Sequence, residues 1–215
     1  MDHLTRQLDF IAEAGRLRGV LRHTVLTDLP PLGESTAAGG SGGAAGGSAR
    51  RENSAEHSWH LAVMALALAD HAPAGTNIAT VVAMLTLHDL VEVDAGDLSA
   101  HAPAAEQERQ HLAEQAAADR LYGLLPAGQG AELRRLWDEF EERVTPEARF
   151  ARALDRLQPI LQDVRAGGRA WRAQGVTADQ VAEKVQLIED GSPSLGEFAR
   201  RLVEQAVADG ILAAG

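Results

Sequence analysis

The sequence contains no cysteine, which excludes several kinds of chemistry at once. The 215 residues can form no disulfide bond, no cysteine-ligated zinc site and no thiol nucleophile. Any transition metal would therefore be bound by histidine and carboxylate side chains. The absence of cysteine is also typical of a reducing compartment, and residues 1–6 show no charged segment followed by an apolar run. We therefore expect a cytoplasmic protein.

Long apolar runs and an excess of positive charge are missing as well. No stretch of about 18 apolar residues occurs, so we expect no membrane partner. The formal net charge of −11 argues against a nucleic-acid polymer as ligand, because a phosphate backbone needs clustered lysine and arginine. A small nucleotide is not excluded, since a metal and a few local cations can hold its phosphate.

Hydrophobic residues make up 45% of the chain but aromatic residues only 4%, so the core must consist mainly of Ala, Leu and Val. Ala and Leu favour helices. Apolar residues recur at helical spacing, which predicts helices near residues 4–21, 55–71, 78–93, 104–122 and 130–143, from 146 onward, and near 177–189 and 194–213. No internal repeat and no second core are visible. We therefore predict one all-α domain over residues 1–215.

Residues 33–49, with the sequence GESTAAGGSGGAAGGSA, interrupt this helical pattern. A segment so rich in Gly, Ser and Ala is typical of a flexible, solvated stretch. We interpret it as a surface insertion, with a lid over a functional site as the alternative.

An adjacent imidazole and carboxylate, His88 and Asp89, follow an apolar run in a helix that we expect to be buried. Burying them is costly unless their charge is compensated, and a divalent cation would do this because both groups are good ligands. A hydrogen-bonded His–Asp pair in the core explains these two residues equally well. Glu92, one helical turn after His88, and Asp97, in the turn that follows, favour the metal site.

Two more candidates lie far from this pair in the sequence. His57 begins the preceding helix, where a lone histidine can also be a surface or capping residue. Asp155 stands between apolar positions and is expected to face inward, although a salt bridge to Arg152 or Arg156 is the alternative.

The order His57, His88–Asp89 and Asp155 resembles that of the HD superfamily of metal-dependent phosphohydrolases, which is named for its His–Asp pair. The surrounding segments are similar to the HD-domain 5'-deoxynucleotidase family. They are ENSAEHS at 52–58, HDLVE at 88–92, GDL at 96–98, LWDEFE at 136–141 and ALD at 153–155. The resemblance covers about residues 8–165. It implies a single HD-type helical bundle with a metal site between its central helices.

The resemblance also implies a role for each residue. One divalent metal, which could be Co, Mn, Zn, Mg or Fe, would be held by His57, His88, Asp89 and Asp155. Glu92 resembles the catalytic carboxylate beside the attacking water. Asp97 resembles its partner, which orients the water or protonates the leaving oxygen. Arg22 resembles an arginine that contacts the substrate phosphate.

The function implied is a metal-dependent phosphohydrolase that cleaves 5'-(deoxy)nucleoside monophosphates to nucleoside and phosphate by attack of a metal-activated water. Its partner would be a small nucleotide, and a homodimer is expected because family members often pair. One alternative is a di-iron HD-type oxygenase, for which His60 or Glu56 could supply a further ligand. The other is a binding protein with a degenerate HD site. Hydrolysis of an alarmone is less favoured, because Glu92 is followed by Val93 and not by an acidic residue.

Overall fold

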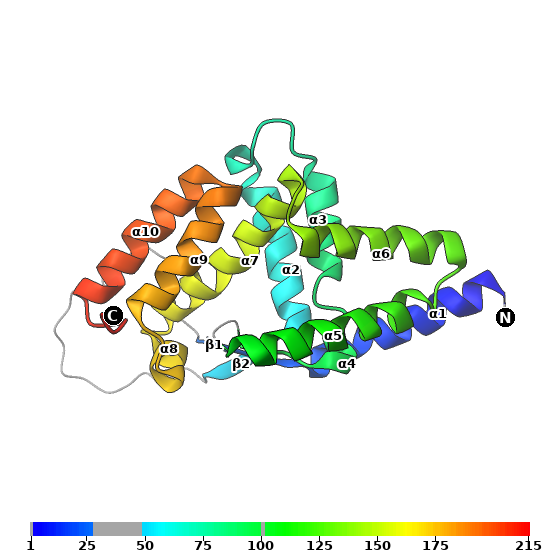
Figure 1. Cartoon of the computed structure of the whole chain (residues 1–215), viewed down its shortest axis with the longest axis horizontal. Helices are drawn as coiled ribbons and strands as arrows, with labels where there is room; N and C mark the ends of the chain where they lie inside the picture. The colour runs from blue at the N-terminus through cyan, green and yellow to red at the C-terminus, as the bar shows by residue number, and fades with distance from the viewer. Residues whose placement is uncertain (1, 28–48, 100–101) are drawn as a thin grey trace.

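The structure, a computed structural model, describes residues 2–27, 49–99 and 102–215. Helices dominate this part of the chain, which confirms the all-α prediction (Figure 1). The elements follow in the order α1 (His3–Ala14), η1 (Gly15–Gly19), β1 (Leu21–Leu26), β2 (Arg50–Asn53), α2 (Ser54–Ala67), η2 (Ala69–His71), α3 (Ile78–Leu87), α4 (Glu92–Ala95), α5 (Ala104–Tyr122), α6 (Ala127–Glu142), α7 (Pro146–Arg165), α8 (Arg169–Gln174), α9 (Ala178–Gly191) and α10 (Pro193–Ala208). Apart from Ala49, the insertion predicted at 33–49 lies outside the described residues. In the three described ranges, no helix combines the length and the apolar character that a membrane span needs.

Helix α7 is the central element of the bundle. It packs against α2, α3 and α9, and α9 also packs against α10. Figure 1 shows α7, α9 and α10 side by side, with α5, α6 and α1 extending toward the opposite end. One cluster of buried apolar side chains lies among α2, α3, α7, α9 and α10, and a second lies among η1, α5, α6 and the end of α3. Leu136 packs against both clusters. That the chain forms one domain stays a prediction.

Helix α2 begins with a capping box, which fixes the position of its first turn. The side chain of Asn53 accepts a hydrogen bond from the Glu56 backbone N–H at 3.0 Å, and the Glu56 carboxylate accepts one from the Asn53 N–H at 3.3 Å. Such reciprocal bonds satisfy backbone donors that a helix start leaves unpaired. His57 follows directly and is fully buried.

A short antiparallel sheet, which the sequence pattern did not predict, joins the N-terminal segment to α2. Strand β1 pairs with β2, so that Leu21 lies opposite Asn53 and Leu26 opposite Arg50. The helix expected over 4–21 ends earlier, with α1 reaching Ala14 and η1 reaching Gly19. Strands of six and four residues are too short to show a clear alternation. The sheet places residue 22 beside the start of α2.

The helix predicted over 78–93 is broken where its polar residues begin. Helix α3 ends at Leu87. The chain continues with hydrogen bonds that span three residues instead of four, such as that from the Leu90 N–H to the Leu87 carbonyl at 3.1 Å. Two buried side chains bind carbonyls at this break: the Tyr122 hydroxyl donates to Leu87 O at 3.2 Å, and Trp137 Nε1 donates to His88 O at 3.1 Å. The prediction of a continuous helix was wrong because these donors replace helical hydrogen bonds.

Candidate metal centre

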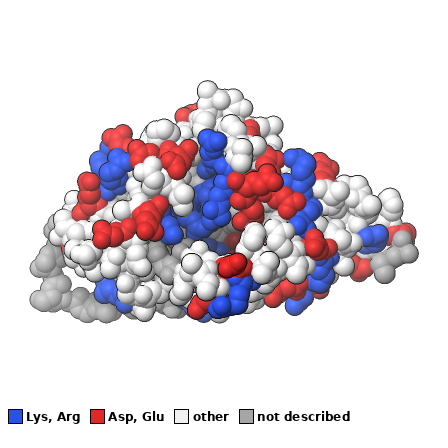
Figure 2. Space-filling model, viewed as in Figure 1, with Lys and Arg blue, Asp and Glu red and all other residues white. Residues whose placement is uncertain are grey.

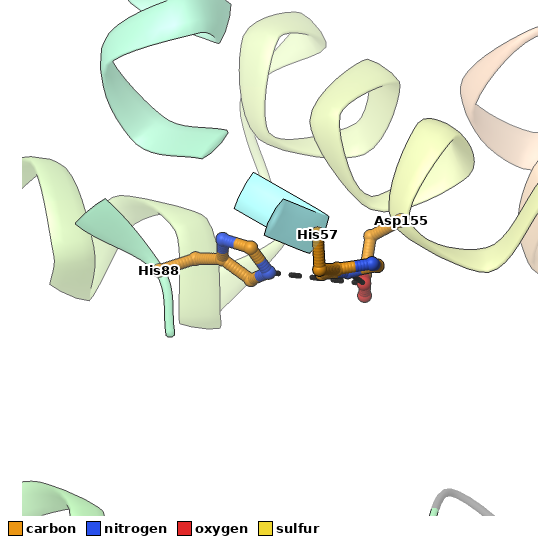
Figure 3. Close-up of side chains that lie close together, drawn as sticks. All are labelled: His57, His88 and Asp155. Atoms are coloured by element: carbon orange, nitrogen blue, oxygen red, sulfur yellow. Dashed lines mark hydrogen bonds and ion pairs between the residues drawn. The ribbon is translucent and has the colours of Figure 1, made fainter. Parts of the chain in front are cut away.

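Three helical segments bring His57, His88 and Asp155 together in the interior (Figure 3). His57 lies in the first turn of α2, His88 directly follows α3, and Asp155 lies in the middle of α7. Asp155 Oδ1 is 3.1 Å from His57 Nε2 and 3.8 Å from His88 Nε2. Within the described part of the chain, these three residues form the one group whose potential ligand atoms all lie within 4.8 Å of one another.

The orientation of the His88 imidazole fits a bound cation. His88 Nδ1 lies 2.9 Å from the Leu85 carbonyl, which can only accept a hydrogen bond, so the ring proton belongs on Nδ1. The remaining nitrogen, Nε2, then turns a lone pair toward the carboxylates, and it is buried without a hydrogen-bond partner. The lone pair of Nε2 and the carboxylate oxygens repel each other, and a divalent cation bound between them would remove this repulsion. Imidazole nitrogen and carboxylate oxygen together are a suitable donor set for such a cation.

Asp89 borders this group on one side. Its Oδ1 is 3.0 Å from His88 Nε2, and its Oδ2 accepts a hydrogen bond from Arg22 Nη1 at 2.7 Å. It does not belong to the group of three whose atoms all lie within 4.8 Å of one another. Its role as a fourth ligand stays a prediction.

Arg22 reaches the same region from β1, although the insertion separates it from His57 in sequence. Its side chain is 12% exposed, and its nitrogens lie within 3.9 Å of four carboxylates. We call these five residues the acidic wall: Arg22, Glu52, Asp89, Glu92 and Asp97. Burial opposes the charge of the guanidinium, but Asp89 and Glu92 raise the pKa of Arg22, so it stays protonated.

The carboxyl groups around the centre differ in their protonation. Burial, reinforced by the nearby charge of Asp89, raises the pKa of Glu92 well above its ordinary value. Burial also acts on Asp155, but Arg156 and His57 outweigh it and hold the pKa of Asp155 well below its ordinary value. A proton-accepting carboxyl group thus lies next to carboxylates that remain charged, which is the division that acid–base chemistry needs.

A cleft of about 350 Å³ opens beside the centre. It is lined by Arg22, Asp89, Glu92 and Asp97 of the acidic wall. It is also lined by four cations from the C-cap of α6 and from α7 and α9, which we call the basic wall: Arg143, Arg152, Arg156 and Lys184. Figure 2 shows Lys and Arg side chains gathered in the hollow at the middle of this face, with Asp and Glu around them.

Both sequence interpretations of Asp155 hold at the same time. Its Oδ1 faces the two histidines, while its Oδ2 accepts a hydrogen bond from Arg152 Nη1 at 3.2 Å and lies 3.8 Å from Arg156 Nε. The inward-facing position and the salt bridge are therefore compatible. Asp155 is the residue at which the metal centre and the basic wall meet.

Two residues that were not predicted to belong to the site contact the candidate site residues. Glu52 is 1% exposed, accepts a hydrogen bond from Gln158 Nε2 at 2.7 Å and has Oε2 at 3.4 Å from His57 Nδ1. Ser54 donates a hydrogen bond to Glu92 Oε2 at 2.6 Å. Both stand in the ENSAEHS segment, so the signal was present in the motif itself.

The residues that could supply further metal ligands lie elsewhere. Glu56 is bound by Arg50 at 2.7 and 2.9 Å, and His60 Nδ1 contacts Gln158 Nε2 at 3.3 Å. Neither residue lines the cleft. Among the residues that the structure describes, no second group of ligand atoms accompanies the first.

A helical bundle that brings two histidines and an aspartate together beside a cleft is an arrangement typical of helical proteins that bind a metal. A family model described as "HD domain" matches residues 41–195. The chain belongs to this HD domain family, which confirms the resemblance found in the sequence.

Similar proteins carry more specific names. The chain is 34% identical to "5'-deoxynucleotidase HDDC2" of Xenopus laevis over 111 residues, which cover 52% of this chain and 53% of that protein. With the Homo sapiens protein of the same name it is 34% identical over 113 residues, covering 53% of each. The chain thus spans about half the length of the curated relatives it matches.

A solved structure matches nearly the whole chain. It is the crystal structure of a "Predicted metal-dependent phosphohydrolase" from Magnetospirillum magnetotacticum MS-1. The two are 44% identical, with a TM-score of 0.84, and the match covers 98% of this chain and 96% of that one.

Proposed function

We propose that the protein is a metal-dependent phosphohydrolase that cleaves 5'-(deoxy)nucleoside monophosphates to nucleoside and phosphate. The observation that carries this proposal is the buried cluster of His57, His88 and Asp155, whose donor atoms converge beside a cleft that His88 and Asp155 line. The names of the HDDC2 relatives support the substrate class, and that of the Magnetospirillum protein supports the reaction class.

The metal ligands that we propose are His57, His88, Asp89 and Asp155. When bound there, a divalent cation supplies a Lewis acid that neutralises phosphoryl charge and makes water more acidic. Two imidazoles and two carboxylates suit Co, Mn, Zn, Mg and Fe alike, so the donor set leaves the identity of the metal open.

Glu92 is the residue that we propose as general base. Its raised pKa suits it to accept a proton from the attacking water, and the Ser54 hydroxyl fixes one of its oxygens. Asp97 lies near the same nitrogen of Arg22 as Glu92 does, and it is proposed to orient the water or to protonate the leaving oxygen. The two carboxyl groups thereby divide the proton transfers of a monoester hydrolysis.

Arg22 is proposed to bind the substrate phosphate. Its guanidinium is held in place by the surrounding carboxylates before any substrate arrives, so little ordering is needed on binding. A guanidinium has five N–H donors, and the structure gives Arg22 one hydrogen bond, from Nη1 to Asp89. The remaining donors can serve the phosphate oxygens.

A phosphate-release screen tests this function. Chelator-treated protein is incubated with deoxy- and ribonucleoside 5'-monophosphates of each base, with Co, Mn, Zn, Mg or Fe added singly. We expect release that requires added metal and is faster for the deoxy member of a pair. If no metal supports release from any nucleotide, the proposal is wrong. Equal rates for deoxy and ribo substrates would reject only the sugar preference.

A further inference from the structure

The basic wall carries more positive charge than its neighbours neutralise. Asp155 pairs with Arg152 and Arg156, and Glu141 Oε2 lies 3.7 Å from Arg143 Nη2. Lys184 has no ion pair within 4.0 Å among the described residues. Three of the four cations therefore share two carboxylates, one of which also belongs to the metal centre, and the fourth has none. In a protein of net charge −11, this local excess calls for an anionic partner.

Arg156 is incompletely paired although it is largely buried. Its side chain is 17% exposed, and its Nε atom is buried without a hydrogen-bond partner. The structure gives its guanidinium no hydrogen bond within the described ranges, although it has five N–H donors. Buried donors without acceptors are costly, and a bound anion would satisfy them.

Arg143 stands at the mouth of the cleft in an unusual backbone conformation. Its φ is 59°, in the left-handed region, and it is the one non-glycine residue of the described chain with a positive φ. It ends α6, where glycine would be the easier residue. Strained conformations of this kind are often kept at ligand sites. Here the arginine side chain lines the cleft together with Arg152 and Arg156.

The basic wall is separate from the place proposed for the reacting phosphate. That phosphate lies by Arg22 and Glu92 on the acidic wall, whereas Arg152 binds the opposite oxygen of Asp155 from the one that faces the histidines. We propose that the basic wall is a second phosphate subsite, and that the preferred substrate is a phosphate monoester carrying a second phosphate group that is not cleaved. The choice of substrate rests on the proposed function, whereas the subsite itself does not.

Binding of inorganic phosphate tests the subsite without any turnover. The full chain, freed of metal by chelator, is titrated with phosphate in a calorimeter. Arg156→Gln and Arg143→Gly should each weaken binding by about tenfold or more, the loss expected for one charge-assisted hydrogen bond. Arg149→Gln, which removes the same charge from an exposed position of α7, should bind phosphate like the wild type.

Arg143→Gly separates binding from folding. Glycine adopts the left-handed conformation without strain, so this variant should unfold at the same temperature as the wild type or higher. A loss of phosphate affinity in a protein of undiminished stability supports the subsite. If the wild type binds no phosphate, or if Arg143→Gly and Arg156→Gln bind it as the wild type does, the proposal is wrong.

Kinetics with matched substrates tests the second phosphate group. We expect kcat/KM for 2'-deoxyadenosine 3',5'-bisphosphate to exceed that for the 5'-monophosphate by about tenfold, and this ratio to fall toward one in Arg143→Gly but not in Arg149→Gln. Equal efficiency with both substrates in the wild type would overturn the substrate proposal while leaving the hydrolase in place. If Arg143→Gly lowered kcat/KM by the same factor for both substrates, the cleaved phosphate would lie on these cations. This result would also overturn the substrate proposal. Failure to release phosphate from either would reject the proposed function, and the titration would then decide the subsite.

Discussion

The acidic wall and the basic wall border the same metal centre but have opposite charge. On the acidic wall, four carboxylates surround one arginine, and the shortest of its contacts joins Arg22 to Asp89 at 2.7 Å. On the basic wall, three arginines share Asp155 and Glu141, and Lys184 adds a fourth positive charge. The difference suits different tasks: carboxylates bind cations and transfer protons, whereas arginines bind anions. An acidic protein can thus present a local positive surface to a phosphorylated substrate.

Asp155 takes part in both walls, so its replacement should have the largest effect. Asp155→Asn removes a charged oxygen from the metal centre and leaves two arginines without their shared partner. We expect the metal content to fall to background and phosphate release to fall to the level of the metal-free protein. Metal content is measured by mass spectrometry of the purified proteins, with the exposed Asp70→Asn as control. A variant that keeps metal and turnover would refute the assignment.

Glu92 tests the acidic wall without disturbing the basic wall. Glu92→Gln removes the proposed general base but keeps the shape and the hydrogen bond from Ser54. We expect kcat to fall by about 10²–10⁴-fold while the metal content stays unchanged. The control is Glu114→Gln, which alters a carboxyl group that lines the same cleft from α5 and should change kcat little. An unchanged kcat in Glu92→Gln would show that Glu92 is not the general base.

Glu52 should have a smaller effect, because it acts on the centre through His57. Its Oε2 lies 3.4 Å from Nδ1 of His57, and we propose that it orients the ring that presents Nε2 to the metal site. We expect Glu52→Gln to weaken metal binding by about 10–100-fold, as other outer-shell changes do. At saturating metal, most of the turnover should return. Wild-type metal affinity, measured by calorimetry, would show that Glu52 does not position the ligand.

Asp163 shows what an α7 carboxyl group does without the arginines that accompany Asp155. Burial, only partly offset by backbone hydrogen bonds from Ala170 and Trp171, raises the pKa of Asp163 to about 6. Because the folded state binds this proton more tightly, the resulting stability is present below the ordinary pKa and is lost as pH rises through about 6. Asp163→Asn has no such proton to lose.

The free energy of unfolding of Asp163→Asn relative to the wild type should therefore rise between pH 4 and pH 7, by at most about 3 kcal/mol. Urea denaturation across this range measures the difference. Parallel pH profiles for the two proteins would contradict the account of Asp163.

The sequence allowed the proximity of His57, His88 and Asp155 to be predicted, because these residues carry local signals. His88 follows a long apolar run, and Asp155 stands among buried positions of α7. Chemistry of this kind is visible in sequence because a charged group in an apolar pattern needs compensation. The helical content could also be predicted from a local signal, because apolar residues recur at helical spacing over most of the chain.

The features that the sequence did not reveal depend on distant partners. The break after Leu87 is stabilised by Tyr122 and Trp137, which lie 35 and 49 residues further along the chain from the carbonyls they bind. The basic wall combines residues of three helices, and each of these cations alone looks like a surface charge. Such arrangements arise only from tertiary packing.

The most direct test of the metal-dependent hydrolase is a titration in which metal and turnover are followed together. Chelator-treated protein receives increasing amounts of one activating divalent cation, and phosphate release from one deoxynucleoside 5'-monophosphate is measured at each step. We predict that release is absent at first, rises in proportion to the metal and saturates at one equivalent per chain. Release without metal, or saturation only at two equivalents, would contradict a single metal held by His57, His88, Asp89 and Asp155.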